Sequence, residues 1–164
     1  MKKSAIISEC GEYRYRLERD FGDEPQAFAF FGVNPSTADS IVDDQTVMKW
    51  VGFSRRNGAG RFIVGNVFAF RATNVKELAS AGDPVGVENT EHIRGIIRDA
   101  DILVPCWGNR AKVPKPLRWK FSVVAALLRE SGKPVRCFGV TKSGDPKHPL
   151  MLPYTTELID FPSA

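Results

Sequence analysis

The chain has 164 residues, of which 43% are hydrophobic and 26% are charged, and its formal net charge is +4 at pH 7. These values predict one globular domain, residues 1–164, that can bury a core without disulfide or metal staples. No signal-peptide pattern or long apolar span is present, so we expect a cytoplasmic protein with no membrane contact. The mildly basic charge is compatible with an anionic partner but does not identify one.

The cysteines and histidines are few. Cys10, Cys106 and Cys137 are not spaced as zinc or iron–sulfur ligands. Cys106 and Cys137 lie in apolar runs and are expected to be small core residues. His92 and His148 are the only histidines. We therefore predict no metal site and no cofactor.

The N-terminal stretch from Ser4 to Arg19 alternates loosely and predicts a short β-hairpin. Arg14, Arg16 and Arg19 lie in its second strand. The favoured interpretation is a solvent-exposed basic face, and the alternative is an edge that faces nucleic acid.

An apolar run that begins at Phe28 ends in Gly32 and then in Asn34-Pro35-Ser36-Thr37, which indicates a buried strand followed by a tight polar loop. Ser36 or Thr37 could cap a helix, or the loop could form part of a site. A helix is predicted from Asp43 or Asp44 to about Asn57. The two aspartates are interpreted either as helix caps or as an acidic pair that positions a water molecule or a substrate group.

The rest of the chain alternates between apolar strands and helices. Strands are predicted at 61–68, 101–109 and 134–140, a helical turn at 76–79, and helices at 88–100 and from after Pro116 to Gly132. The tail, residues 150–164, is expected to be irregular. Four apolar strands with intervening helices predict an α/β fold, a three-layer α/β/α sandwich with a mostly parallel four-stranded sheet beside the N-terminal hairpin.

Polar loops follow all four predicted strands. Because the carboxyl ends of parallel strands share one edge of a sheet, these loops are expected to form one cleft. The loops bring together Asn34, Ser36, Thr37, Asn66, Arg71, Asn109, Lys142 and His148. This set is rich in amides and bases, so it suits hydrogen bonding to a base edge or a phosphate better than metal-assisted hydrolysis. No Walker motif is present, and Ser36 lacks the setting of a hydrolase nucleophile.

The motifs together resemble a bacterial and phage family designated domain of unknown function 1643. The similarity runs in order over nearly the whole chain, through residues 34–38, 43–46, 66–73, 83–89, 107–108 and 139–150. This family carries no assigned activity.

A more distant similarity is to uracil-DNA glycosylases, and it extends to the fold. Their ordered motifs resemble Gly32-Val33-Asn34-Pro35, Gly65-Asn66, Trp107-Gly108 and His148-Pro149. The resemblance implies that Asn34 orients the attacking water, that Asn66 reads the base and that His148 stabilises charge on the leaving base. A flipped base would stack on Phe68 or Phe70. Leu150 stands where those enzymes have serine, and no wedge-like segment follows it.

The sequence therefore predicts an enzyme that cleaves the N-glycosidic bond of a base, including a modified base, in nucleic acid. Asn34, His148 and Asp43 are the predicted catalytic residues. The predicted substrate-binding residues are Gly32, Pro35, Ser36, Thr37, Asn66, Phe68, Phe70, Arg71, Thr73, Trp107, Asn109 and Lys142. DNA or a nucleotide is the expected partner. The alternatives are a hydrolase or transferase that holds a free nucleotide through Arg71 and Lys142, and a non-catalytic module that binds nucleic acid or protein.

Overall fold

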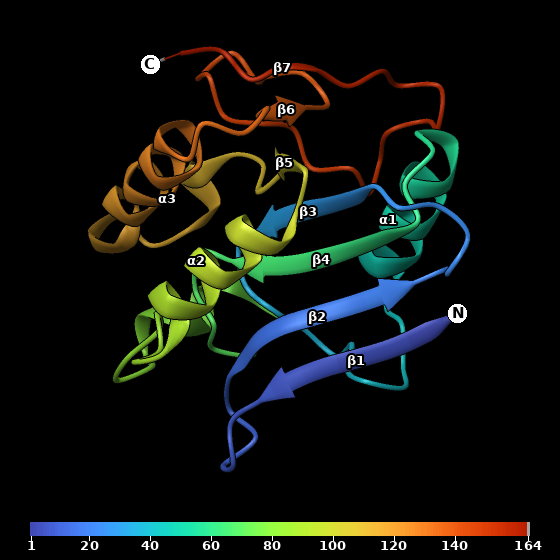
Figure 1. The fold of residues 1–164 in the computed structure, drawn as a ribbon. Helices are drawn as coiled ribbons and strands as arrows, with labels where there is room; N and C mark the ends of the chain where they lie inside the picture. Colours follow the sequence, from blue (N-terminus) through green and yellow to red (C-terminus); the bar gives the residue numbers. More distant parts are fainter. Residues whose placement is uncertain (164) are drawn as a thin grey trace.

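The computed structural model describes residues 1–163 as a mixed α/β protein built on a five-stranded sheet (Figure 1). Its strands are β1 (Lys2–Ile7), β2 (Arg14–Asp20), β3 (Ala27–Gly32), β4 (Arg61–Asn66) and β5 (Ile102–Pro105), in the order β1-β2-β4-β3-β5. β3 pairs in parallel with β4 and β5, whereas β2 pairs antiparallel with both β1 and β4. The predicted hairpin is therefore present, and it extends the central sheet.

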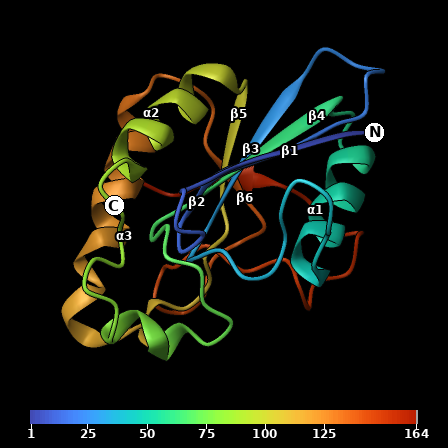
Figure 2. The same ribbon diagram turned by 90° about the horizontal axis from the view of Figure 1, so that it is seen from below.

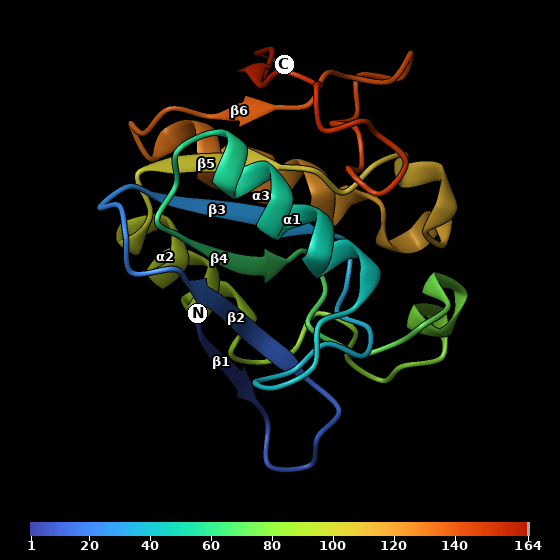
Figure 3. The same cartoon turned by 90° about the vertical axis from the view of Figure 1, so that its right-hand side faces the viewer.

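The parallel strands end level with one another. Gly32 lies opposite Asn66 in the β3–β4 register, and Phe31 lies opposite Pro105 in the β3–β5 register. Both faces of β3 are buried, which explains its continuous apolar sequence. Because the carboxyl ends of β3, β4 and β5 are in register, the loops that follow these strands start at the same edge of the sheet (Figure 3).

Helices cover both faces of the sheet (Figure 2). α1 (Gln45–Arg56) packs on one face, where its Trp50 and Phe53 contact the core around Phe30. α2 (Asn89–Asp99) and α3 (Trp119–Glu130) share the core on the other face. Short 3-10 turns are η1 (Val75–Ala79), η2 (Arg110–Lys112) and η3 (Lys115–Leu117). Within residues 1–163, no helix is long and apolar enough to cross a membrane.

The predicted fourth strand is not part of the sheet. Only Arg136–Cys137 form a strand, β6, which pairs antiparallel with β7 (Ile159–Asp160) in the tail that was expected to be irregular. A single parallel bridge, Leu103 to Val135, links this region to β5. Pro134 has no N–H to donate, and Gly139 turns the chain with a φ of +100°, so a longer ladder cannot form here. The predicted mostly parallel four-stranded sheet is not confirmed: three strands are parallel, and the two strands of the hairpin extend the sheet in antiparallel pairing.

Candidate functional site

A cavity of about 400 Å³, lined by both polar and apolar side chains, lies at the carboxyl ends of β3 and β4. This is where ligands bind in open α/β sheets. From among the residues predicted for the site, the structure brings together Gly32, Asn34, Ser36, Asn66, Thr73, Trp107 and His148 around this cavity. The residues that follow β3, β4 and β5 converge because these parallel strands end level with one another, and the loops that carry Thr73 and His148 complete the wall.

The Asn66 side chain is the most distinctive group in the cavity wall. Asn66 is the last residue of β4 and is only 3% exposed, yet none of the described side-chain hydrogen bonds involves its amide. Asn89 fixes the strand end by donating to the backbone carbonyl of Asn66 at 2.9 Å. Gly32 makes room beside it, because a Cβ at that position would lie 3.0 Å from Asn66 Oδ1. The amide therefore presents a donor and an acceptor side by side to a ligand.

The Asn34 amide is held in one orientation. Its Nδ2 donates to the carbonyl of Ala72 at 2.7 Å and to that of Pro35 at 3.1 Å. Both donor contacts are directed to the backbone, so Oδ1 is left to accept a hydrogen bond from a water molecule or a ligand at the cavity.

His148 is held as a neutral donor. Its Nδ1 accepts a hydrogen bond from the backbone N–H of Leu150 at 3.2 Å, which leaves the ring proton on Nε2. Burial lowers the pKa of His148 below its usual value, and the charge of Lys112 lowers it further, although Asp44 acts in the opposite direction. A neutral imidazole with Nε2–H can donate to an oxygen that gains negative charge.

The His148 shift predicts a pH-dependent contribution to stability. Because the folded-state pKa lies below the reference value of 6.5, the unfolded chain binds more protons between those two values. The free energy of unfolding should therefore fall as the pH decreases through 6.5 towards the folded-state pKa. Urea titrations of the wild type and of His148→Gln between pH 7.5 and 5 measure this. A decrease of equal size in both proteins would contradict the assignment.

Arg14 and Asp44 line the cavity as well. Neither is among the predicted catalytic or substrate-binding residues, although the acidic-pair interpretation of Asp43 and Asp44 allowed a site role for Asp44. Arg14 is 3% exposed, and its Nη1 donates to the carbonyl of Ala38 at 2.8 Å, whereas its Nε has no partner among residues 1–163. Burial lowers the pKa of Arg14 to about 10; Asp44 opposes this shift and Arg71 adds to it. Asp44 caps α1 by accepting from the N–H of Val47 at 2.9 Å. The cavity wall thus contains a desolvated cation beside a carboxylate.

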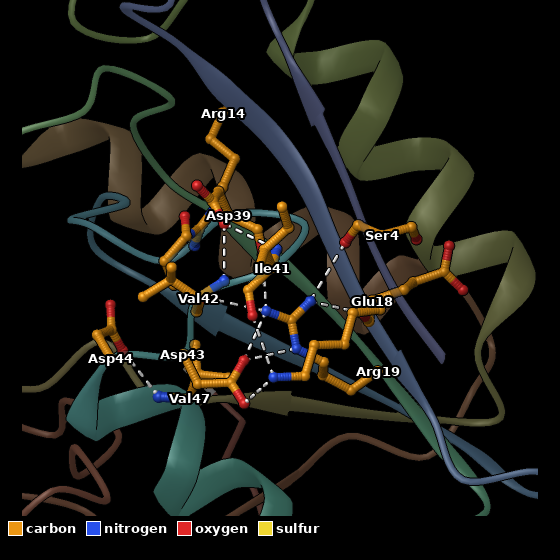
Figure 4. Close-up of polar contacts among 12 residues, drawn as sticks. Ser4, Arg14, Glu18, Arg19, Asp39, Ile41, Val42, Asp43, Asp44 and Val47 are labelled. Carbon is orange, nitrogen blue, oxygen red and sulfur yellow. Dashed lines mark hydrogen bonds and ion pairs between the residues drawn. The ribbon is translucent and has the colours of Figure 1, made fainter. Parts of the chain in front are cut away.

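A β-bulge explains why the strand arginines are not solvent-exposed as predicted. Ile6 pairs with Arg16 and Ile7 with Arg14, so Tyr15 has no partner and the alternation of faces shifts by one residue. Arg14 and Arg19 consequently both reach the loop that leads into α1 (Figure 4). Arg16 pairs instead with Glu18 and Asp99.

The predicted catalytic residue Asp43 does not line the cavity. Arg19 donates to Asp43 Oδ1 through Nε at 2.8 Å, and Lys3 pairs with Oδ2 at 2.8 Å (Figure 4). Burial favours the neutral carboxyl, but the hydrogen bonds from Lys3 and Arg19 outweigh it and lower the pKa of Asp43. Asp43 therefore anchors the loop, while its neighbour Asp44 faces the cavity.

A second cavity of about 470 Å³ adjoins the first. Thr37, Phe70 and Arg71 line it, and it shares Ser36 and Thr73 with the main cavity. Thr37, Phe70 and Arg71 are therefore close to the main cavity but line only the second one.

The remaining predicted residues lie elsewhere. Phe68 is buried in the core against Phe121, so it cannot stack on a ligand. Pro35 is buried, Asn109 caps η2, and Lys142 is exposed and lines neither cavity. Trp50 supplies an aromatic wall of the main cavity. Trp50 is not among the predicted site residues, because it lies within the predicted helix and not in a loop after a strand.

Together, the fold and the cavity define a mixed α/β protein with a candidate ligand site at the carboxyl edge of its parallel strands. A family model described as protein of unknown function (DUF1643) matches residues 14–150, and the chain belongs to this family. The match confirms the family resemblance in the sequence. No curated protein and no solved structure matches the chain. Among residues 1–163, His, Cys, Asp and Glu side chains form no group of three or more that could hold a metal ion.

Proposed function

We propose that the cavity binds a pyrimidine nucleotide of a nucleic acid and that the protein cleaves its N-glycosidic bond, as uracil-DNA glycosylases do. The unpartnered Asn66 amide carries this proposal. Its adjacent donor and acceptor match the alternating groups on a pyrimidine edge. The amide faces the cavity, so a ligand that pairs with both of its groups is selected over one that leaves either group without a partner.

The neighbouring groups suit the chemical step. The bond between C1′ and the base nitrogen breaks with its electron pair moving to the base, water adds to C1′, and the proton lost from water ends on the base. Asn34 Oδ1 accepts a hydrogen bond from that water, and His148 Nε2–H donates to the base oxygen where charge develops. The Arg14 charge at the wall also favours an anionic leaving base.

The finer fold assignment belongs to the same proposal. A glycosylase-like three-layer sandwich is supported by α1 on one face of the parallel strands and by α2 and α3 on the other (Figure 2).

Base release tests the proposed activity directly. The protein is incubated with single- and double-stranded oligonucleotides that carry uracil, mismatched thymine or modified pyrimidines, and abasic sites are measured by alkaline cleavage. We expect release from at least one substrate, with free base as the second product. Heat-denatured protein is the control. Intact substrates throughout would contradict the proposal.

A free nucleotide as substrate is the second candidate, favoured by the adjoining cavity that contains Arg71. Arg71 lines the adjoining cavity together with Ser36 and Thr73, which also line the main cavity. A nucleotide whose base occupies the main cavity could therefore place its phosphate beside Arg71 in the adjoining cavity. Lys142 lies outside both cavities and does not contribute. Product analysis separates the candidates, because phosphate transfer or hydrolysis releases no free base.

A further inference from the structure

A strongly basic loop adjoins the cavity. We call residues 109–120, which follow β5 and run into the first turn of α3, the basic loop. Lys112 of this loop lines the cavity. From Ile102 to Arg129 the chain has no aspartate or glutamate, and its cations are Arg110, Lys112, Lys115, Arg118, Lys120 and Arg129. The positive charge beside the cavity is therefore not balanced by acidic residues of the same segment.

Two arginines shape the basic loop and leave its lysines available. Arg110 pairs with the buried Asp145 at 2.7 Å. Arg118 donates to the carbonyls of Val113 at 2.8 Å and Ala111 at 2.9 Å, which brings the end of the loop back towards its start. No ion pair within residues 1–163 involves Lys112, Lys115 or Lys120.

The same loop exposes an aromatic ring. Trp119 is 63% exposed, whereas Trp50 and Trp107 are buried. Lys120 Nζ lies 5.7 Å from the centre of the Trp119 ring, so a cation and an open aromatic face occupy the same surface. Leaving a large indole in water is unfavourable, and an aromatic ring among lysines is the combination that binds single-stranded nucleic acid, through stacking on bases and attraction to phosphates.

We propose that the basic loop docks the single strand that flanks the nucleotide in the cavity, with Trp119 stacked on a base and Lys112, Lys115 and Lys120 beside phosphates. Only the identity of the nucleotide in the cavity rests on the proposed function. A single strand fits better than a duplex because its bases offer open faces to Trp119, whereas paired bases are stacked on each other. It fits better than a membrane surface because Lys112 joins the loop to a cavity that contains amide and imidazole groups.

Binding of a fluorescently labelled 12-nucleotide oligodeoxythymidylate, measured by anisotropy, tests this inference. Trp119→Ala should weaken binding about tenfold. Lys115→Ala/Lys120→Ala should weaken it and reduce the slope of log K against log salt by about 1.4, because each phosphate contact contributes about 0.7. The matched control Arg56→Ala/Arg98→Ala removes two exposed cations outside the loop and should bind like the wild type.

Two results would overturn the inference: unchanged affinity in both loop variants, or binding of a duplex or of anionic phosphatidylserine vesicles as tight as that of the single strand. The oligonucleotide is used at equilibrium and needs no bond cleavage. If the oligonucleotide binds with the expected dependence on the loop but no base is released, the proposed function is contradicted and this inference stands. If both loop variants release base at the full wild-type rate, this inference is contradicted and the proposed function stands.

Discussion

Replacing Asn34 by alanine should lower the rate of base release by about two to three orders of magnitude. Oδ1 of Asn34 is the acceptor that orients water, since its Nδ2 already donates to Ala72 and Pro35. Alanine removes that acceptor while the rest of the cavity wall remains. Single-turnover rates on the best substrate from the base-release assay measure the loss.

The matched control is Asn57→Ala. Asn57 follows α1 at the end opposite to Asp44, and its side-chain Nδ2 donates to the carbonyl of Phe53. We expect this variant to keep the wild-type rate. Circular dichroism melts of both variants separate catalysis from folding, because Asn34→Ala also loses two hydrogen bonds. A folded Asn34→Ala protein with an undiminished rate would remove Asn34 from the mechanism.

Replacing Arg19 by alanine should lower the free energy of unfolding by about 3–5 kcal/mol, as expected when a buried ion pair loses one partner. Arg19 is completely buried. Besides its pairing with Asp43, it donates to the carbonyls of Asp39 at 2.7 Å and Glu18 at 2.8 Å (Figure 4). Alanine leaves these acceptors without their donor and also opens a void. Equilibrium unfolding in urea measures the change.

Lys3→Ala is the control for Arg19→Ala, because Lys3 pairs with the same carboxylate. Its side chain is partly exposed, so we expect a loss below about 1 kcal/mol. Similar losses in the two variants would show that the buried hydrogen bonds of Arg19 contribute little beyond the ion pair.

The parts of the structure that the sequence predicted correctly depend on local patterns. α1 begins after Asp44 because an aspartate at that position accepts from the backbone of the first turn, and this signal is visible in the sequence. The clustering of Asn34 and Asn66 followed from polar residues placed at the ends of adjacent parallel strands. These inferences need only the chain near each residue and the rule for parallel strands. His148 lines the same cavity, although the strand predicted before it is not part of the sheet.

The parts that were missed depend on long-range pairing. The antiparallel contact of β2 with β4 joins segments that are far apart in sequence, and no hydrophobic period specifies it. The bulge at Tyr15 moves the Arg14 side chain to the opposite face of the sheet. A strict alternation of side chains along β2 therefore could not predict that Arg14 lines the cavity. Likewise, Asp43 and Asp44 are adjacent and chemically alike, and the long-range partners of Asp43, which are Lys3 and Arg19, distinguish it from Asp44 at the cavity.

The hairpin arginines couple the edge of the sheet to the cavity. Arg14 and Arg19 of β2 hold the backbone of residues 38–42 by hydrogen bonds to Ala38, Asp39 and Val42, and this stretch links Ser36 to Asp44 in the cavity wall. A transient opening of the hairpin would release that wall at the same time. The N-terminal edge and the candidate site therefore form one cooperative unit, in which local unfolding at one end reaches the other.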